Sequence, residues 1–113
     1  MDDLTEITAR LVQEFSPEKV VLFGSRARGT QSSGSDFDLF LVVPEPHERP
    51  AQRARRAYRC LRGIRTPTDI IVRTRSEYER FLPVIASLEA RVAREGVVLF
   101  ERMIGPRETQ RLS

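Results

Sequence analysis

The sequence predicts a single α/β (α+β) domain, a small mixed β-sheet of about four strands flanked by helices. Four short runs rich in β-branched and aromatic residues have the length of strands and are bounded by Gly, Ser or Pro. Between them, apolar residues recur at helical spacing. The 113 residues are 40% hydrophobic and 31% charged, a composition typical of a soluble globular domain. We expect this domain to span residues 1–102 and to be followed by a loose tail, residues 103–113.

The N-terminal segment is expected to be a helix of about three turns that leads into the first strand. Residues 16–18, Ser-Pro-Glu, end this helix because proline cannot continue the hydrogen-bond ladder. The first strand is then expected at residues 20–23 and the second at residues 37–43. The helix is predicted from apolar residues at helical spacing, namely Leu4, Ile7, Leu11 and Phe15.

A helix at residues 50–63 is expected to connect the second strand to a third at residues 68–72. A strand, a helix and a further strand favour a right-handed crossover between parallel strands. On this helix the apolar face is predicted to hold Ala51, Ala54, Ala57, Tyr58 and Leu61, and the opposite face to hold Arg49, Arg53, Arg55, Arg56, Arg59 and Arg62.

The C-terminal part is expected to be two helical pieces and a last strand. Residues 76–79 are typical of a helix start, Pro83 breaks that helix, and a second piece runs to about residue 95. Gly96 should end the second piece, and residues 97–100 should form the strand. The residues predicted to pack on the sheet are Val84, Leu88 and Val92.

Two carboxylates are expected to lie together at the start of the second strand. Alternate side chains of a strand share a face, so Asp36 and Asp38 project to one side, away from Phe37 and Leu39. Like charges this close repel each other and call for a cation. Oxygen ligands suit Mg²⁺, which usually takes one or two carboxylates and the phosphates of a substrate. This pattern therefore indicates a phosphorylated substrate.

The turn after the first strand is suited to phosphate. Gly24 has no Cβ, and Ser25 supplies a hydroxyl where a short helix can begin, so backbone N–H groups can face a phosphate there. If the first two strands are antiparallel, this turn meets the aspartates. Asp69 opens the third strand, and a parallel crossover would bring it to the same end of the sheet.

These residues form a motif of Gly24-Ser25, ten intervening residues, and Asp36-Phe37-Asp38, within the strings LFGSRARG and SDFDL. Over residues 20–101 the sequence resembles the minimal nucleotidyltransferases of the DNA polymerase beta-like superfamily. Their fold agrees with the sheet predicted above. The family carries a third carboxylate on a later strand, and Asp69 in TDIIV matches it.

The resemblance implies transfer of AMP from ATP to an acceptor hydroxyl, with release of pyrophosphate. Asp36 and Asp38 would hold two Mg²⁺ ions, for which Mn²⁺ could substitute, and Asp69 would complete the ion nearer the acceptor. All three would thus be catalytic residues and metal ligands. The nucleotide would be bound by Gly24 and Ser25 at the β- and γ-phosphates, with added charge from Arg26.

The resemblance also implies a partner. Minimal nucleotidyltransferases resemble one half of a toxin–antitoxin pair, in which a small helical HEPN protein is the ribonuclease toxin. The chain would then act as antitoxin by AMPylation of a tyrosine of that toxin.

An alternative interpretation makes the chain a non-catalytic binding module or regulator that docks a partner protein or nucleic acid through the Arg-rich helix at residues 49–65. A net charge of +3 suits either ligand. Tyr58 is expected on the apolar face, so no aromatic residue is placed among these arginines to stack on bases, and the sequence lends nucleic acid no specific support.

The remaining features favour a cytoplasmic protein. The N-terminus is acidic and unlike a signal peptide, and no apolar stretch approaches the length of a membrane span. The single cysteine, Cys60, excludes an internal disulfide. His47 is expected to be a solvated loop residue.

Overall fold

The computed structural model describes residues 3–24, 36–45 and 48–102. Helices and strands follow one another in this part of the chain in the order that the apolar patterns predict. In chain order the elements are α1 (Asp3–Phe15), β1 (Lys19–Phe23), β2 (Phe37–Val43), α2 (Pro50–Cys60), β3 (Thr68–Thr74), α3 (Arg75–Phe81), α4 (Leu88–Glu95) and β4 (Val97–Glu101).

The strands form one mixed four-stranded sheet in the order β3-β2-β1-β4. β1 is antiparallel to both of its neighbours, β2 and β4. β2 and β3 are parallel, so the crossover expected through the helix between them is confirmed. The predicted mixed sheet flanked by helices is therefore correct.

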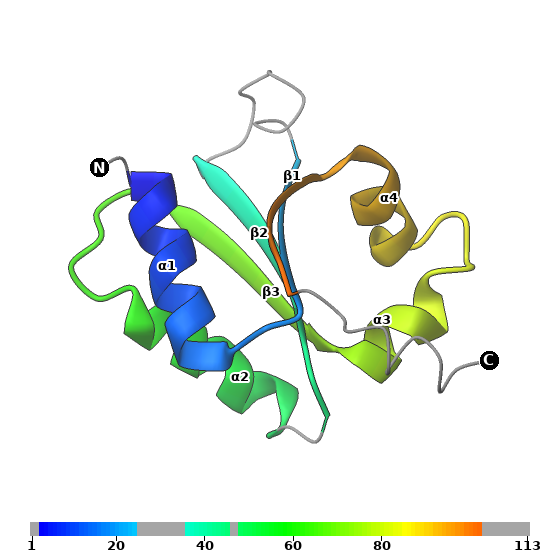
Figure 1. The fold of residues 1–113 in the computed structure, drawn as a ribbon, viewed down its shortest axis with the longest axis horizontal. Coiled ribbons are helices and arrows are strands. Elements are labelled where there is room, and N and C mark those ends of the chain that lie inside the picture. The colour runs from blue at the N-terminus through cyan, green and yellow to red at the C-terminus, as the bar shows by residue number, and fades with distance from the viewer. Residues whose placement is uncertain (1–2, 25–35, 46–47, 103–113) are drawn as a thin grey trace.

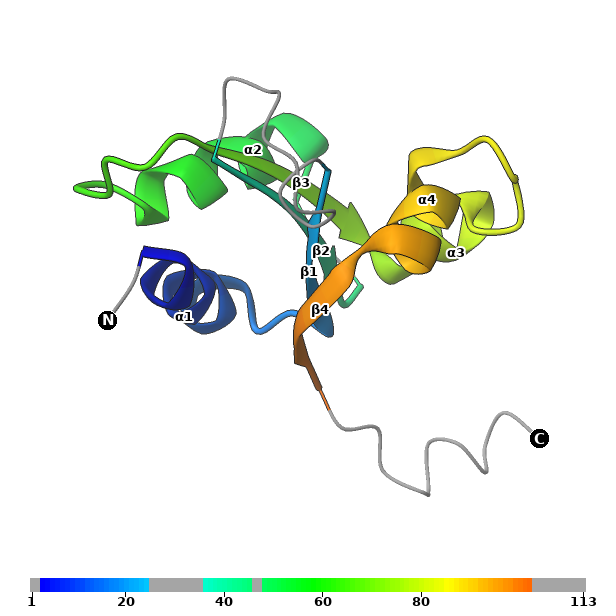
Figure 2. The same ribbon diagram turned by 90° about the horizontal axis from the view of Figure 1, so that it is seen from above.

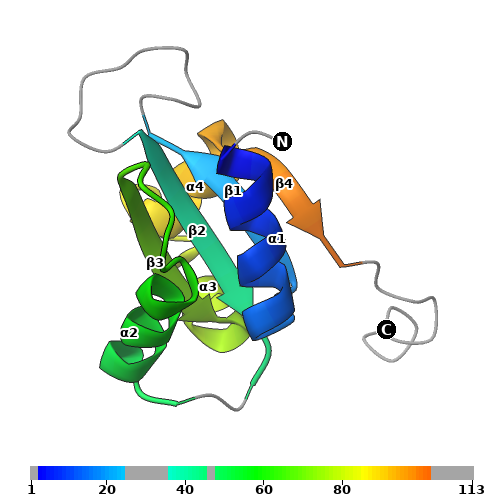
Figure 3. The same ribbon diagram turned by 90° about the vertical axis from the view of Figure 1, so that its left-hand side faces the viewer.

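The helices cover the sheet on both faces. α1 and α2 lie on one face, and α3 and α4 lie on the other (Figures 1 and 2). Viewed from the side of α1 and α2, these two helices stand in front of the strands (Figure 3). The result is the three-layer arrangement that lets a sheet bury apolar side chains on both faces.

Each face of the sheet has its own apolar cluster, and β2 contributes to both. Phe37, Leu39 and Leu41 pack in the cluster under α1 and α2. Phe40 and Val42 pack in the cluster under α3 and α4. The alternation predicted for this strand is therefore confirmed, and Asp38 falls on the α3–α4 face. The buried residues contributed by α1 are those of its predicted stripe, Ile7, Leu11 and Phe15.

The predicted phase of α2 was wrong in part: Ala57 and Leu61 are buried as predicted, but three other residues differ. Arg53, predicted to face solvent, is only 2% exposed, and its Nη2 donates to both carboxylate oxygens of Glu77, at 3.1 and 3.2 Å. Ala51 is exposed instead. Tyr58 is 47% exposed, and its hydroxyl accepts a hydrogen bond from the backbone N–H of Ile70. The error has a physical cause, because the carboxylate that makes burial of the guanidinium tolerable lies on α3, far along the sequence.

The predicted packing of Val84 was also wrong. α3 ends at Phe81 and α4 begins only at Leu88, so residue 84 lies in the turn between them and is 51% exposed. Val92 is buried, and Leu88 packs against the same cluster, as predicted. α3 begins slightly earlier than expected, because Thr74 caps it in a capping box with Glu77.

Within the described residues, none of the helices is both long enough and apolar enough to span a bilayer. The lone thiol, Cys60, is half-buried, and that burial raises its pKa. Predictions that concern the short helix after Gly24, His47 and the tail at residues 103–113 lie outside the described residues.

Candidate active site

The candidate site is centred on two carboxylates carried by neighbouring parallel strands. Asp38 of β2 is paired in register with Asp69 of β3. In a parallel pair, residues in register project from the same face. Ile71, two residues after Asp69, belongs to the apolar cluster under α3 and α4, which assigns both carboxylates to this face. The predicted convergence of Asp38 and Asp69 at one end of the sheet is thus seen in the strand register.

Gly24 lies directly against the carboxylate of Asp38. β1 and β2 are antiparallel, with Phe23 opposite Asp38, so the chain leaves β1 beside this side chain. A Cβ added to Gly24 would stand 2.5 Å from the Asp38 Oδ2 atom, well inside van der Waals contact. The backbone φ of Gly24 is +80°, in the left-handed region that favours glycine. Two separate constraints therefore require glycine at this position.

Asp36 lies just before β2 rather than within it, and its side chain is exposed. Its backbone N–H donates to the carbonyl of Pro67 at 2.9 Å. That bond ties the start of β2 to the residue just before β3. The main chain is thereby held where Asp36, Asp38 and Asp69 all belong to the same end of the sheet.

The floor of the site is apolar and aromatic. The ring of Phe40 meets the ring of Phe23 edge-on at a centroid distance of 6.4 Å, and it meets the ring of Tyr78 at 5.8 Å. Phe40 is two residues beyond Asp38 on the same face, so it packs beneath the carboxylate end of the strand. A rigid floor of this kind limits the positions open to the strands that carry the aspartates.

One charged residue on this face was missed by sequence reasoning. Arg73 follows Ile71 in the alternation of β3, and its Nε donates to Glu89 of α4 at 3.3 Å. The Glu89 side chain is 7% exposed and that of Arg73 is 36% exposed, so a half-buried ion pair joins α4 to the sheet. The alternation of β3 could have assigned Arg73 to the face of Asp69, but nothing in the sequence identified Glu89 as its partner.

The carboxylates suit a hard cation in chemical type. Mg²⁺ and Mn²⁺ prefer oxygen ligands, and the absence of a side chain at Gly24 lets the Asp38 carboxylate lie against the main chain. Across residues 3–24, 36–45 and 48–102, no three His, Cys, Asp or Glu side chains gather closely enough to hold a metal. Metal ligation by Asp36, Asp38 and Asp69 therefore stays a prediction. Ser25 and Arg26, predicted to bind the nucleotide, lie outside the described residues.

Comparison with known proteins assigns the family. The model of the nucleotidyltransferase domain family matches residues 4–101, which include every strand of the sheet. A solved structure from Sulfolobus solfataricus, described as a candidate nucleotidyltransferase, shares 28% sequence identity with this chain. The two superimpose with a TM-score of 0.61 over 88% of this chain and 78% of the other. No curated protein matches the sequence.

The chain belongs to the nucleotidyltransferase domain family. The mixed sheet with helices on both faces is the fold of this family, and nucleotidyl transfer is its general chemistry. A nucleoside triphosphate is accordingly the expected ligand of the site.

Proposed function

We propose that this nucleotidyltransferase transfers AMP from ATP to a hydroxyl of a partner protein and depends on Mg²⁺. The observation that carries the proposal is the register of Asp38 with Asp69, with Gly24 lying against the Asp38 carboxylate. Two carboxylates on one face and a glycine beside them are the parts that metal-bound triphosphate needs.

Each residue has a separate task in this proposal. Asp36 and Asp38 would hold two Mg²⁺ ions, or Mn²⁺ in their place, and the ions would supply positive charge beside the triphosphate. Asp69 lies nearest the acceptor and takes its proton as the hydroxyl attacks the α-phosphorus. The bond to pyrophosphate breaks as the new phosphoester forms. Gly24 and Ser25 orient the β- and γ-phosphates, and Arg26 adds positive charge.

The acceptor is proposed to be a tyrosine of a small helical HEPN-type toxin. Proteins that the sequence resembles belong to such toxin–antitoxin pairs. Added AMP carries negative charge and bulk, which would silence a ribonuclease site. The chain would accordingly act as a cytoplasmic antitoxin.

A second candidate role is supported by the outer surface of α2. Arg55, Arg59 and Arg62 line a hollow of about 550 Å³ with Ala54 and Tyr58. Arg55 and Arg59 are one turn apart on the same side of the helix, and Arg62 follows just after its end, so an anionic partner could neutralise all three. Docking of a partner protein or nucleic acid through this helix, without catalysis, is the alternative function.

Transfer to a purified partner separates the two functions. A candidate partner is sought as a small helical protein encoded in an adjacent reading frame; it is incubated with the chain, ATP and Mg²⁺, and its mass is measured. Wild type should add AMP to it, whereas Asp38→Asn and Asp69→Asn should each reduce the rate by at least about a hundredfold. Glu101→Gln is the matched control, because it removes an exposed carboxylate paired with Lys19 at the opposite end of the sheet.

A different result would contradict the proposal that the chain is a catalyst. If wild type and Asp38→Asn neutralise the partner equally well and neither changes its mass, the chain acts by binding alone. Circular dichroism of each variant shows whether a loss of activity is a loss of fold.

A further inference from the structure

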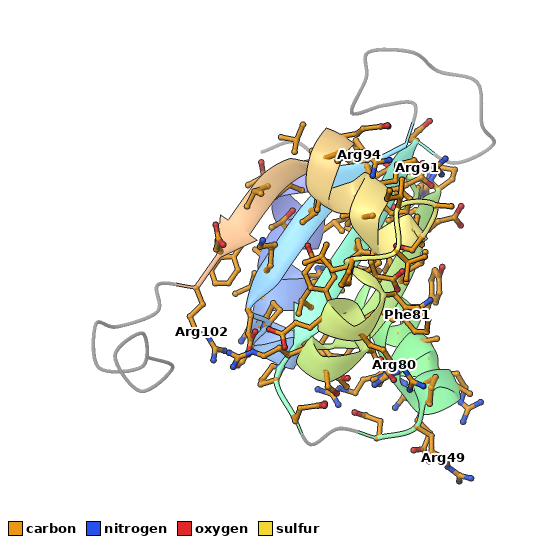
Figure 4. The ribbon with its side chains drawn as sticks, turned by 90° about the vertical axis from the view of Figure 1, so that its right-hand side faces the viewer. Arg49, Arg80, Phe81, Arg91, Arg94 and Arg102 are labelled. Atoms are coloured by element: carbon orange, nitrogen blue, oxygen red, sulfur yellow. The ribbon has the colours of Figure 1, made fainter. Side chains whose placement is uncertain are left out.

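The turn between α3 and α4 exposes an apolar cluster rimmed by arginines. Phe81, Val84 and Ile85 are exposed at 45%, 51% and 81%. We call this surface the α3–α4 patch; its members are Phe81, Val84 and Ile85 with Arg80, Arg91 and Arg94. Figure 4 labels Arg80 and Phe81 on α3 and Arg91 and Arg94 on α4, in front of the sheet on the side away from α1 and α2. Exposed apolar patches with a polar rim mark interaction sites.

The turn is held in place by hydrogen bonds. The backbone N–H of Val84 donates to the carbonyl of Phe81 at 3.0 Å, and that of Ser87 donates to the carbonyl of Val84 at 2.9 Å. The Ser87 hydroxyl also donates to the carbonyl of Phe81, at 2.7 Å, and Arg94 donates to the carbonyl of Ile85. The apolar side chains are therefore displayed on a preorganised turn, which lowers the entropy lost on binding.

The arginines of the patch differ in their pairing from three other arginines near α3 and α4. Arg53, Arg73 and Arg75 each form an ion pair with a glutamate. Arg80 lies over the ring of Phe81, and Arg94 donates to a backbone carbonyl. Among the described residues, Arg80, Arg91 and Arg94 make no ion pair. Their charge is available to carboxylates from another molecule.

A hollow beside the turn gives the patch its shape. It measures about 430 Å³ and is lined by residues 85–88 with Arg91 and Arg94. α4 lies toward the end of the sheet where β2 begins, in both views of Figures 1 and 3. The patch is thus on the face of the sheet that carries Asp38 and Asp69.

We propose that the α3–α4 patch docks the protein that supplies the acceptor hydroxyl, an inference that rests on the proposed function. The partner presents an apolar side chain to Ile85 and the hollow, and a fringe of Asp and Glu to Arg80, Arg91 and Arg94. Arginine and aromatic residues are enriched at protein interfaces. Nucleic acid fits less well, because its backbone would leave Val84 and Ile85 without apolar contacts.

The test begins with photo-cross-linking in the cells that produce this protein. A benzophenone amino acid is placed at position 85 or, as a comparison, at position 58 on the α2 surface. Position 85 should cross-link a protein, and the Asp38→Asn form should give the same product, because docking precedes transfer. A nucleic-acid product at position 85, or none, would overturn the proposal.

Affinity then decides whether the patch contributes to binding. The cross-linked protein is purified and titrated against Val84→Asp and against Val98→Asp, a control valine of nearly equal exposure, 49%, on β4. Val84→Asp should weaken binding at least about tenfold, since it puts a carboxylate in an apolar contact facing acidic groups. Val98→Asp should change the dissociation constant less than about twofold. Equal affinities of wild type and Val84→Asp would overturn the proposal.

Failure of the proposed function would look different. In that case the protein cross-linked at position 85 still binds, and Val84→Asp still weakens it, but its mass does not increase with ATP and Mg²⁺. Metal-dependent binding of ATP by Val84→Asp should match wild type, which confines its defect to docking.

Discussion

Substitution of Gly24 by alanine tests whether the Asp38 carboxylate must approach the β1–β2 turn. The added Cβ would lie 2.5 Å from Oδ2 and 3.2 Å from Cγ of Asp38. Contacts below 3.0 Å force one partner to move, and here the atom that must move belongs to the proposed metal-binding carboxylate. Gly24→Ala should therefore displace the Asp38 side chain and reduce nucleotidyl transfer.

The chain supplies a matched control for backbone strain. Gly63 has φ +92°, close to the +80° of Gly24, but a Cβ at Gly63 would meet no atom within 4 Å. Both alanine variants are strained by the left-handed conformation, which costs about 1–2 kcal/mol. In Gly24→Ala the end of the Asp38 side chain must shift as well, which costs little stability but moves the carboxylate. For a domain of this size 1 kcal/mol lowers the melting temperature by about 4–8 °C, so strain alone is measurable.

Calorimetry and the transfer assay together decide the matter. Gly63→Ala should lower the melting temperature and keep the transfer rate of wild type at 25 °C. Gly24→Ala should lose a similar amount of stability but at least about tenfold in rate, since small displacements of a catalytic group are costly. If the two variants are equally stable and equally active, the close approach of Gly24 to Asp38 has no functional consequence.

Two further predictions concern the link between α2 and α3. Arg53→Gln should destabilise the fold by about 1–3 kcal/mol in urea unfolding, because it removes a buried guanidinium that binds Glu77. The control Arg59→Gln, on the exposed side of α2, should change the free energy of unfolding by less than about 0.5 kcal/mol. Equal effects of the two substitutions would show that the ion pair contributes nothing to stability. Burial acts to raise the pKa of Glu77, but hydrogen bonds from the Thr74 N–H and from Arg53 outweigh it and lower the pKa below the ordinary value of 4.5. The stability that Glu77 contributes is thus present above pH 4.5 and lost as the pH falls through the lowered pKa. The free energy of unfolding of Glu77→Gln should therefore depend less on pH than that of wild type over that window. Parallel curves of stability against pH for the two proteins would contradict this.

The location of the candidate site could be predicted from sequence because it depends on local regularities. Alternation in a strand determined the face of Asp38, and a strand–helix–strand unit favoured parallel pairing with the strand of Asp69. Both rules act over short segments. The close contact between Gly24 and Asp38 also follows from antiparallel strands joined at that end.

The errors arose where a distant partner decides the outcome. Arg53 is buried because Glu77, on another helix, accepts its hydrogen bonds. The spacing of residues within α2 cannot identify that glutamate as a partner. Val84 is exposed because the turn after Pro83 breaks the helical phase on which its burial was predicted. The α3–α4 patch was missed for the same reason, since the second helical piece begins only at Leu88 and the residues just before it form an exposed turn.

The geometry of the candidate site depends on how firmly the core fixes β2. Leu39, Phe40 and Leu41 are each fully buried, on alternating faces of the sheet. A slip of β2 by one residue would move Asp38 into the apolar cluster under α1 and α2 and turn Leu39 toward α3 and α4. Both changes are costly, because a charge would be buried and a packed side chain would be lost. The pairing of Asp38 with Asp69 is therefore enforced by apolar residues that never contact a substrate, and core substitutions in β2 should reduce transfer before they unfold the chain.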